Sequence, residues 1–238
     1  MLQSLPRGLL GACLLMLGAT GPAFADYTSA KHRFEALSPE TQTSITLALI
    51  ATGDFEGLSD HGYTHLLYKA IRSFETREAF VPDGILNREE AARLKALAEH
   101  FYARLGSRYY AHPETGAKLL VPRKLFDHEQ STEDGILFTR KDAMLSLSFV
   151  SFPSRRKSFE ALYEQLSSTT PDKRVIYKRR FATHFVATGF FTGRKFYSWM
   201  AKTGNSSTGF TVSWSDDWEE MGRKVSVLLA NAFLAQPG

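Results

Sequence analysis

Residues 60–75 read DHGYTHLLYKAIRSFE, and residues 80–87 follow closely as FVPDGILN. The first stretch places its apolar side chains at i, i+3, i+4 and i+7, the spacing of one helix face. These side chains are Leu67, Ala70, Ile71 and Phe74. The opposite face is polar, and a turn marked by Asp and Gly stands on each side. The pattern predicts a short amphipathic helix that buries one stripe and leaves the turn before it open as a shallow binding lip.

Two further helices are predicted around this one. Ser38 followed by Pro39 is typical of a helix start, because the hydroxyl caps backbone N–H groups and proline fits the first helical position. Asn87 with Glu90 three residues later is a capping signature for another helix. Residues 38–106 are therefore expected to form one domain of three helices joined by short turns.

This predicted domain resembles the peptidoglycan-binding-like domain found in many bacterial cell-wall hydrolases and envelope proteins. The family pattern is approximately G-[YF]-x-G, then D-G-x-[FY]-G-x-x-T-x-x-A-[VI]-x-x-F-Q, then a second D-G-x-x-G turn. Glu75 stands where the family has glutamine. The matching positions are Asp60, Tyr63, Ala70, Ile71, Phe74, Asp83 and Gly84. The resemblance implies a helical module that binds the bacterial cell wall without catalysing a reaction.

The chain departs from the family pattern at four other positions. His61 and Thr64 replace glycines, Leu67 replaces threonine, and Asn87 replaces the last glycine. Asparagine tolerates left-handed backbone or caps a helix, so Asn87 is a mild change. A turn that needs positive φ at position 61 or 64 would have to be reshaped, and glycan contacts implied by the resemblance would change with it.

The candidate ligand-binding residues are Tyr63, Tyr68 and Arg72. Sugar faces stack on aromatic rings, and the peptide carboxylates of peptidoglycan pair with basic groups, so these residues have suitable chemistry. Each of these residues could instead have a purely structural role. Tyr68 and Arg72, at i and i+4, fit a solvated helix surface, and Tyr63 fits a turn residue packed on the core. The sequence leaves both interpretations open.

The N-terminus predicts export to the periplasm. Residues 1–25 carry one charge, Arg7, then an apolar stretch, and end in Ala23-Phe24-Ala25, a small-x-small motif of the kind that signal peptidase cleaves. Glycines interrupt the apolar stretch before it reaches the ~20 residues of a membrane span. No other segment is apolar enough to span a membrane, so no transmembrane segment is expected after signal cleavage.

Cleavage would also remove Cys13, the sole cysteine. The remaining chain would then have no thiol nucleophile, no disulfide and no thiolate metal ligand. The formal net charge of the whole chain is +4. This mild excess, together with export, argues against nucleic acid as a partner.

Beyond residues 107–114, which are predicted to be a linker, the hydrophobic period changes from helical to strand-like. Apolar residues alternate with serines over residues 145–149, as in a half-buried strand. A helix, further strands within residues 174–214 and a closing helix over residues 219–234 follow. This order predicts an α+β domain over residues 115–235, an antiparallel-sheet sandwich with the sheet on one side and helices on the other. The order resembles that of the PsbP-like superfamily of small exported domains.

No catalytic residue is predicted. The chain lacks the G-x-S-x-G motif of α/β-hydrolases, and the mature chain lacks the cysteine of a wall transpeptidase. Carboxylates for glycoside hydrolysis are available in one cluster. They are Asp216, Asp217, Glu219 and Glu220. Acids directly before a helix more often face its macrodipole. His61 and His65 lack the glutamate of an HExxH site, so neither a metal nor another cofactor is expected.

The leading hypothesis is an exported, non-catalytic protein that binds peptidoglycan through its helical domain and presents the α+β domain to an unknown envelope protein. One alternative is a cell-wall-targeted enzyme with its chemistry in the C-terminal domain. Another is a protein-interaction scaffold without wall affinity.

Two features of the C-terminal domain are candidates for partner contact. One is a cationic stretch, which also fits simple solvation of a strand edge; it comprises Lys173, Arg174, Lys178, Arg179 and Arg180. The other is a line of aromatic residues. Because the side chains of a strand alternate between the two faces of a sheet, about half of these residues are expected to lie in the core. The aromatic line comprises Phe190, Phe191, Phe196, Tyr197 and Trp199.

Overall fold

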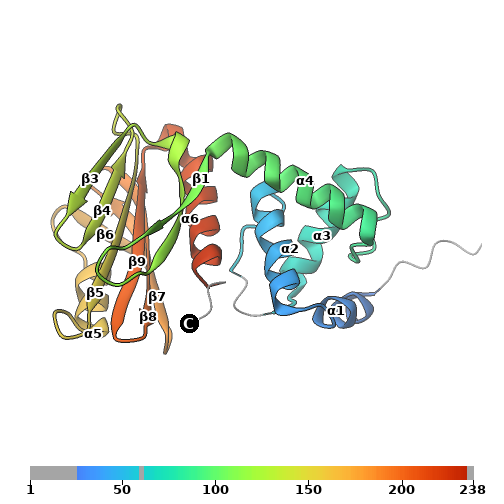
Figure 1. The fold of residues 1–238 in the computed structure, drawn as a ribbon, viewed down its shortest axis with the longest axis horizontal. Helices are drawn as coiled ribbons and strands as arrows, with labels where there is room; N and C mark the ends of the chain where they lie inside the picture. Colours follow the sequence, from blue (N-terminus) through green and yellow to red (C-terminus); the bar gives the residue numbers. More distant parts are fainter. Residues whose placement is uncertain (1–25, 59–61, 235–238) are drawn as a thin grey trace, which may run out of the picture.

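The computed structural model describes residues 26–58 and 62–234. The predicted signal peptide, residues 1–25, lies outside the described residues, as do Asp60 and His61 of the first turn. Most of the helices occupy one side of the molecule and a seven-stranded antiparallel sheet the other, with one helix between them (Figure 1). The predicted α+β fold class is confirmed.

Four helices form the N-terminal part of the molecule, which we call the helical unit. They are α1 (Tyr27–Glu35), α2 (Pro39–Thr52), α3 (His65–Arg77) and α4 (Arg88–Leu105). The three predicted helices are α2, α3 and α4. α1 is an additional helix, capped by the Asp26 carboxylate, which accepts a hydrogen bond from the Ser29 N–H.

The helix starts follow the capping residues seen in the sequence. The Ser38 hydroxyl accepts a hydrogen bond from the Thr41 N–H at the start of α2. Asn87 and Glu90 form a complete capping box at the start of α4, in which each side chain bonds the other residue's backbone N–H. Each cap satisfies backbone donors that have no partner inside the helix.

α3 buries the apolar stripe that its sequence predicts. Leu67, Ala70, Ile71 and Phe74 are all buried. Full burial of a side chain as large as Leu, Ile or Phe contributes roughly 1.5–3 kcal/mol. A helix as short as α3 is marginal in water alone, so packing rather than intrinsic propensity holds it in place.

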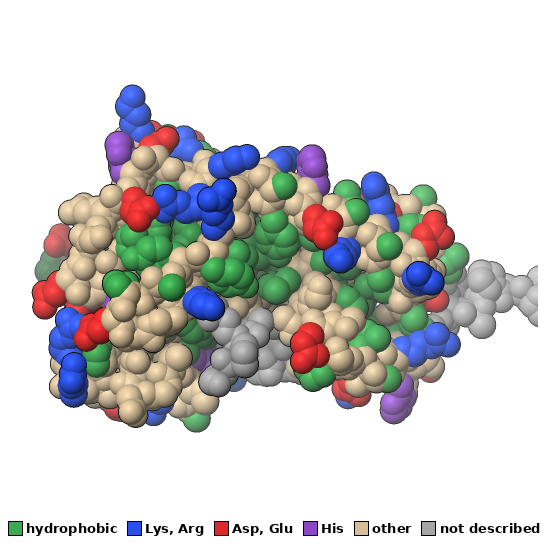
Figure 2. All heavy atoms as spheres, in the orientation of Figure 1, with side chains coloured by type: hydrophobic (Ala, Val, Ile, Leu, Met, Phe, Trp, Pro, Cys, Tyr) green, Lys and Arg blue, Asp and Glu red, His purple; other side chains and the backbone are tan. Residues whose placement is uncertain are grey.

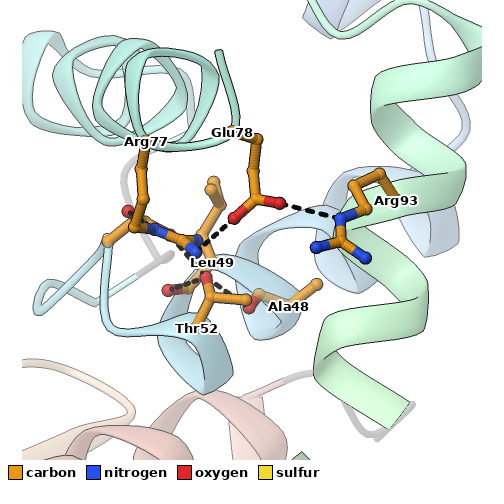
Figure 3. A network of polar contacts seen from close by, with 7 residues as sticks. Ala48, Leu49, Thr52, Arg77, Glu78 and Arg93 are labelled. Carbon is orange, nitrogen blue, oxygen red and sulfur yellow. Dashed lines mark hydrogen bonds and ion pairs between the residues drawn. The ribbon is translucent and has the colours of Figure 1, made fainter. Parts of the chain in front are cut away.

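A polar network ties the ends of α2 and α3 to α4 (Figure 3). The Arg77 guanidinium lies 2.8 Å from the Asp54 carboxylate and 2.5 Å from that of Glu78. Glu78 in turn binds Arg93 of α4 at 2.7 Å. Thr52 donates to Asp54 at 2.6 Å. The side chains of Asp54 and Glu78 are nearly buried. Salt therefore screens these ion pairs less than it screens ordinary surface pairs.

The large sheet has the strand order β3-β4-β5-β9-β8-β7-β6, with every neighbouring pair antiparallel. The strands that the sequence predicts are found at β5 to β9. The bounds are β3 (His128–Thr132), β4 (Gly135–Thr139), β5 (Leu145–Pro153), β6 (Lys173–Arg180), β7 (His184–Phe191), β8 (Arg194–Thr203) and β9 (Ser206–Trp214). β3 and β4 are additions to that prediction.

The predicted linker is wrong, because a strand lies in its place. β1 (Ser107–Ala111) starts directly after α4 and pairs antiparallel with β2 (Lys118–Pro122). Tyr110 of β1 makes edge contacts with Phe138 and Phe149 of the large sheet, at ring distances of 5.9 and 6.0 Å. The hairpin therefore packs on the sheet and does not act as a flexible spacer.

Helices cover both faces of the sheet, which corrects the expected arrangement of helices on one side only. α5 (Phe159–Ser167) packs on Phe185 and Met200, whereas α6 (Glu219–Leu234) places Phe233 against Trp199. Successive side chains of a strand point to opposite faces. Since Met200 directly follows Trp199, α5 and α6 lie on opposite faces of the sheet.

The helical unit and the sheet share one hydrophobic core. A single cluster of buried side chains runs from Phe74 of α3 through Leu229 of α6 to Trp199 of β8. α6 stands between the sheet and α2 in Figure 1. The two predicted domains are thus packed together through α6, whose sequence lies far from the helices that it contacts.

Candidate functional site

Tyr63, one of the three predicted ligand-binding residues, lies in the core. Only 4% of it is exposed, and its hydroxyl donates a hydrogen bond of 3.1 Å to the Gly84 carbonyl. Its ring packs on Phe34 of α1 at 5.0 Å. Burial raises the pKa of the Tyr63 hydroxyl above its ordinary value. Tyr63 therefore fits the structural interpretation that the sequence left open and does not line a surface lip.

Tyr68 and Arg72 lie together at the surface of α3. The Arg72 guanidinium stands over the Tyr68 ring, 5.5 Å from its centre. Arg72 is exposed, Tyr68 is half-buried, and Arg72 Nε donates a hydrogen bond of 2.8 Å to the Pro82 carbonyl. The second turn of the predicted module thus fixes the position of the arginine.

Two aromatic side chains that the sequence analysis did not select continue this surface. The rings of Tyr27 and His65 stack at 3.8 Å with an interplanar angle of 19°, and Tyr27 meets the edge of Tyr68 at 5.6 Å. We call Tyr27, His65, Tyr68 and Arg72 the aromatic lip. His65, Tyr68 and Arg72 share one helix face at i, i+3 and i+7, a spacing that could have been found in the sequence. Tyr27 belongs to α1, which was not predicted.

His65 stacks on Tyr27. Within the described parts of the chain, no group of three or more His, Cys, Asp or Glu residues is placed to hold a metal ion. His61, the other half of the predicted His pair, lies outside the described residues.

Gly84 forms the floor of the lip. Its φ of 80° is left-handed, and a Cβ added there would lie 2.2 Å from the Tyr68 ring. Glycine is therefore required for both its backbone conformation and its lack of a side chain. The Gly84 N–H donates a hydrogen bond of 2.8 Å to Glu75 Oε2.

Glu75 is a fully buried carboxylate beneath this turn. Its Oε1 atom has no hydrogen-bond partner within the described residues. Burial raises the pKa of Glu75; the hydrogen bond from the Gly84 N–H opposes this, and the nearby acids Asp83 and Glu90 add to it, so that the pKa lies at about 7. The support of the lip therefore includes a group that changes charge near neutral pH.

The family departure at Thr64 does not strain the turn. Thr64 has a φ of −103° and caps α3, with its hydroxyl accepting a hydrogen bond of 3.2 Å from the Leu67 N–H. Among the described residues of this turn, Gly62 has left-handed backbone, with a φ of 67°. Threonine thus serves as an N-cap at a position where the family has glycine.

The cationic stretch on β6 largely holds α5 in place. Lys173 Nζ donates to the carbonyl of Gln165 at 2.8 Å, and Lys178 Nζ donates to that of Ser167 at 3.3 Å. The last carbonyls of a helix carry partial negative charge and lack intrahelical partners. Two of the five cations therefore cap the C-terminus of α5, and a third, Arg180, pairs with Glu160 at its start.

Two of the acids at the start of α6, Asp216 and Glu219, are engaged in structural contacts. The Glu219 carboxylate accepts a hydrogen bond from Trp214 Nε1 at 2.7 Å and lies 3.0 Å from Lys195 Nζ. The hydrogen bond from Trp214, followed by that from Lys195, lowers the pKa of Glu219 below its usual value. A general acid in glycoside hydrolysis needs a raised pKa.

Only part of the aromatic line is accessible. Phe196 and Trp199 are buried, whereas Phe191 is 48% exposed. Phe190 and Tyr197 line a groove beside α6. On the face drawn in Figure 2, acidic and basic side chains are interspersed, with hydrophobic side chains between them.

No protein-family model matches this chain, and no curated protein matches it. Among solved structures, the chain is similar to PsbP (CyanoP) from the cyanobacterium Synechocystis sp. PCC 6803, with 13% sequence identity and a TM-score of 0.39. The match covers 52% of this chain and 89% of the cyanobacterial chain. This is a weak structural resemblance and carries no argument about function. The resemblance to the peptidoglycan-binding-like family stays a prediction.

Among the described residues, no helix is both long enough and apolar enough to cross a lipid bilayer.

Proposed function

We propose that this chain is an exported, non-catalytic protein that binds peptidoglycan through the aromatic lip and presents its α+β part to another component of the cell envelope. The observation that carries the proposal is the arrangement of the lip. Rings from α1 and α3 are stacked against each other, and the guanidinium beside them is fixed by a carbonyl of the next turn. A surface held in this way loses little conformational entropy when it binds a ligand.

The lip has chemistry that suits the two components of peptidoglycan. The rings of His65 and Tyr68 offer flat apolar surface with polar edges, which suits the face of a sugar. Within the described residues, no acidic side chain forms an ion pair with Arg72, so its terminal nitrogens are available to a stem-peptide carboxylate. Tyr63 supports this surface from beneath without contacting the ligand.

Export is supported by the position of the predicted cleavage site. Cleavage after Ala25 would leave Asp26 and the whole of α1 on the mature chain. Asp26 caps α1, and α1 supplies Tyr27 to the lip. The mature protein would therefore retain every residue of the proposed site.

Co-sedimentation with purified sacculi tests the proposal. We expect the mature protein to pellet with sacculi, and we expect His65→Ala/Tyr68→Ala/Arg72→Ala to reduce the pelleted fraction about tenfold, because it removes both the stacking surface and the cation. Tyr63 is left intact, since truncating a buried ring costs roughly 3–5 kcal/mol of stability and would confuse the result.

A matched control carries the same types of change elsewhere on the surface. His100→Ala/Lys95→Ala/Tyr109→Ala alters exposed residues of α4 and β1 and is expected to pellet like the unaltered protein. Equal pelleting of both variants would refute the lip assignment. An unaltered protein that stays in the supernatant would instead favour the scaffold without wall affinity, and release of muropeptides would favour the enzyme.

A further inference from the structure

A groove lies between the helical unit and the sheet, away from the aromatic lip. Its volume is about 420 Å³, within the ~300–1,000 Å³ that small-molecule sites occupy. α6 supplies one wall, the end of α2 with the residues after it supplies another, and β6 to β8 supply the floor. Sites between two packed parts of a protein are common places for ligands.

Aromatic side chains make up much of the groove. Phe190 and Tyr197 come from the sheet, Trp214 from the end of β9, and Phe55 from the segment after α2. Phe190 and Tyr197 are half-buried, whereas Trp214 and Phe55 are only 4% and 3% exposed and contribute small edges to the wall. An ion pair between Arg223 of α6 and Glu56 joins the two walls.

Among the described residues, one cation of the groove is in no close ion pair, although the carboxylates of Glu220, Asp54 and Glu56 act on it from farther away. Lys195 is held by Asp216 and Glu219, each at 3.0 Å. Lys224, in contrast, forms no ion pair or hydrogen bond within the described residues, and its ammonium contacts the Phe101 ring at 4.9 Å. It stands beside Gly53 at the end of α2, where the carbonyls of Leu49 and Ile50 already accept backbone hydrogen bonds.

Burial lowers the pKa of Lys224, so its charge is costly to keep in place. An anion beside it would offset that cost with a charge-assisted hydrogen bond. Removing apolar ligand surface from water contributes roughly 25 cal/mol per Å² in addition. The groove therefore favours a ligand with both an apolar body and one negative group.

We propose that this groove binds a small amphipathic carboxylate, with its alkyl or aromatic body against Phe190, Tyr197 and Trp214 and its carboxylate at Lys224. Neither the aromatic lip nor peptidoglycan takes part, so the proposal is independent of the function proposed above. A neutral or cationic molecule of the same length would leave Lys224 without a close anionic partner and should bind less tightly.

Calorimetric titration of the mature protein with decanoate, decanol and decylamine tests this site. We expect decanoate to bind at one site, at least tenfold more tightly than decylamine. Lys224→Met keeps the length of the side chain and removes its charge, so it should weaken decanoate binding about tenfold, or about 1.4 kcal/mol, and leave decanol binding little changed. Lys31→Met, on α1, is the control and should bind like the unaltered protein.

A second pair of variants tests the apolar part of the groove. Val227→Trp should fill the groove and abolish binding of all three ligands, and Phe190→Ala should weaken decanoate and decanol alike. Phe190 is half-buried at the rim of the core, so its variant remains informative if Val227→Trp does not fold. The proposal is overturned if decanoate shows no saturable binding up to millimolar concentration, if decylamine binds as tightly, or if Lys224→Met leaves the preference for decanoate unchanged.

Discussion

Glu75→Gln is expected to stabilise the protein by up to about 3 kcal/mol at pH 8 and to have little effect at pH 4. The folded protein holds the pKa of Glu75 at about 7, against an ordinary value of 4.5. A raised carboxyl pKa means that the folded state keeps a proton that the unfolded state releases. One unit of pKa corresponds to about 1.4 kcal/mol, which gives the expected magnitude.

The sign of the pH dependence follows from linkage. Below pH 4.5 Glu75 is protonated in both states and costs nothing. Between 4.5 and about 7 the unfolded state binds fewer protons than the folded state, so the free energy of unfolding falls as pH rises. Above about 7 the carboxylate is charged and buried in the folded state, and the cost is constant.

Glutamine removes this dependence while keeping the contact to the turn. Its amide oxygen can accept the hydrogen bond that Glu75 Oε2 accepts from the Gly84 N–H. Urea unfolding of both proteins from pH 4 to pH 8 measures the effect, because other titrating groups contribute equally and cancel in the difference. Glu99→Gln is the control, since Glu99 is an exposed carboxylate of α4. A difference that does not grow with pH would refute the assignment.

Gly84→Ala is expected to destabilise the protein by about 2–5 kcal/mol. Part of the loss is the cost of holding alanine in left-handed backbone, about 1–2 kcal/mol. The remainder comes from the clash of the new Cβ with the Tyr68 ring, 2.2 Å away, since overpacking costs typically 1–3 kcal/mol. Denaturant unfolding measures the total.

Two further variants separate these contributions. Gly62→Ala has a similar φ of 67° and no neighbour within 4 Å of the added Cβ, so it should show the backbone cost alone. Adding Tyr68→Ala to Gly84→Ala removes the clash, and the double-mutant cycle should show favourable coupling between the two changes. Additive losses would mean that Tyr68 does not pack on Gly84 as described.

Local residue chemistry was enough to predict the helices of the N-terminal part. The stripe of Leu67, Ala70, Ile71 and Phe74 and the caps at Ser38 and Asn87 act within a few residues, and each was found where expected. Local patterns also predicted β5 to β9 and α6, because their apolar residues alternate or recur with a clear period.

The site residues were harder to predict, because their roles depend on contacts across the chain. Tyr63 and Tyr68 look alike in sequence, yet the former is buried against Phe34 of α1 and the latter is half-buried beside Arg72. The lip requires α1 to deliver Tyr27, and α1 lacks a strong apolar period. Lys178 likewise appeared to be a free surface cation, whereas α5 places a carbonyl within its reach.

The sequence by itself determined the positions of α2 to α6 and of β5 to β9, because capping and side-chain periodicity act over one or two turns of chain. Only the tertiary structure decided that residues 107–111 pair as a strand, that α6 joins the helical unit to the sheet, and that Lys224 stands in an aromatic groove with no close ion pair among the described residues. The last two features bring together residues far apart in the chain. Their energies come from burial and charge at contacts that no local pattern encodes.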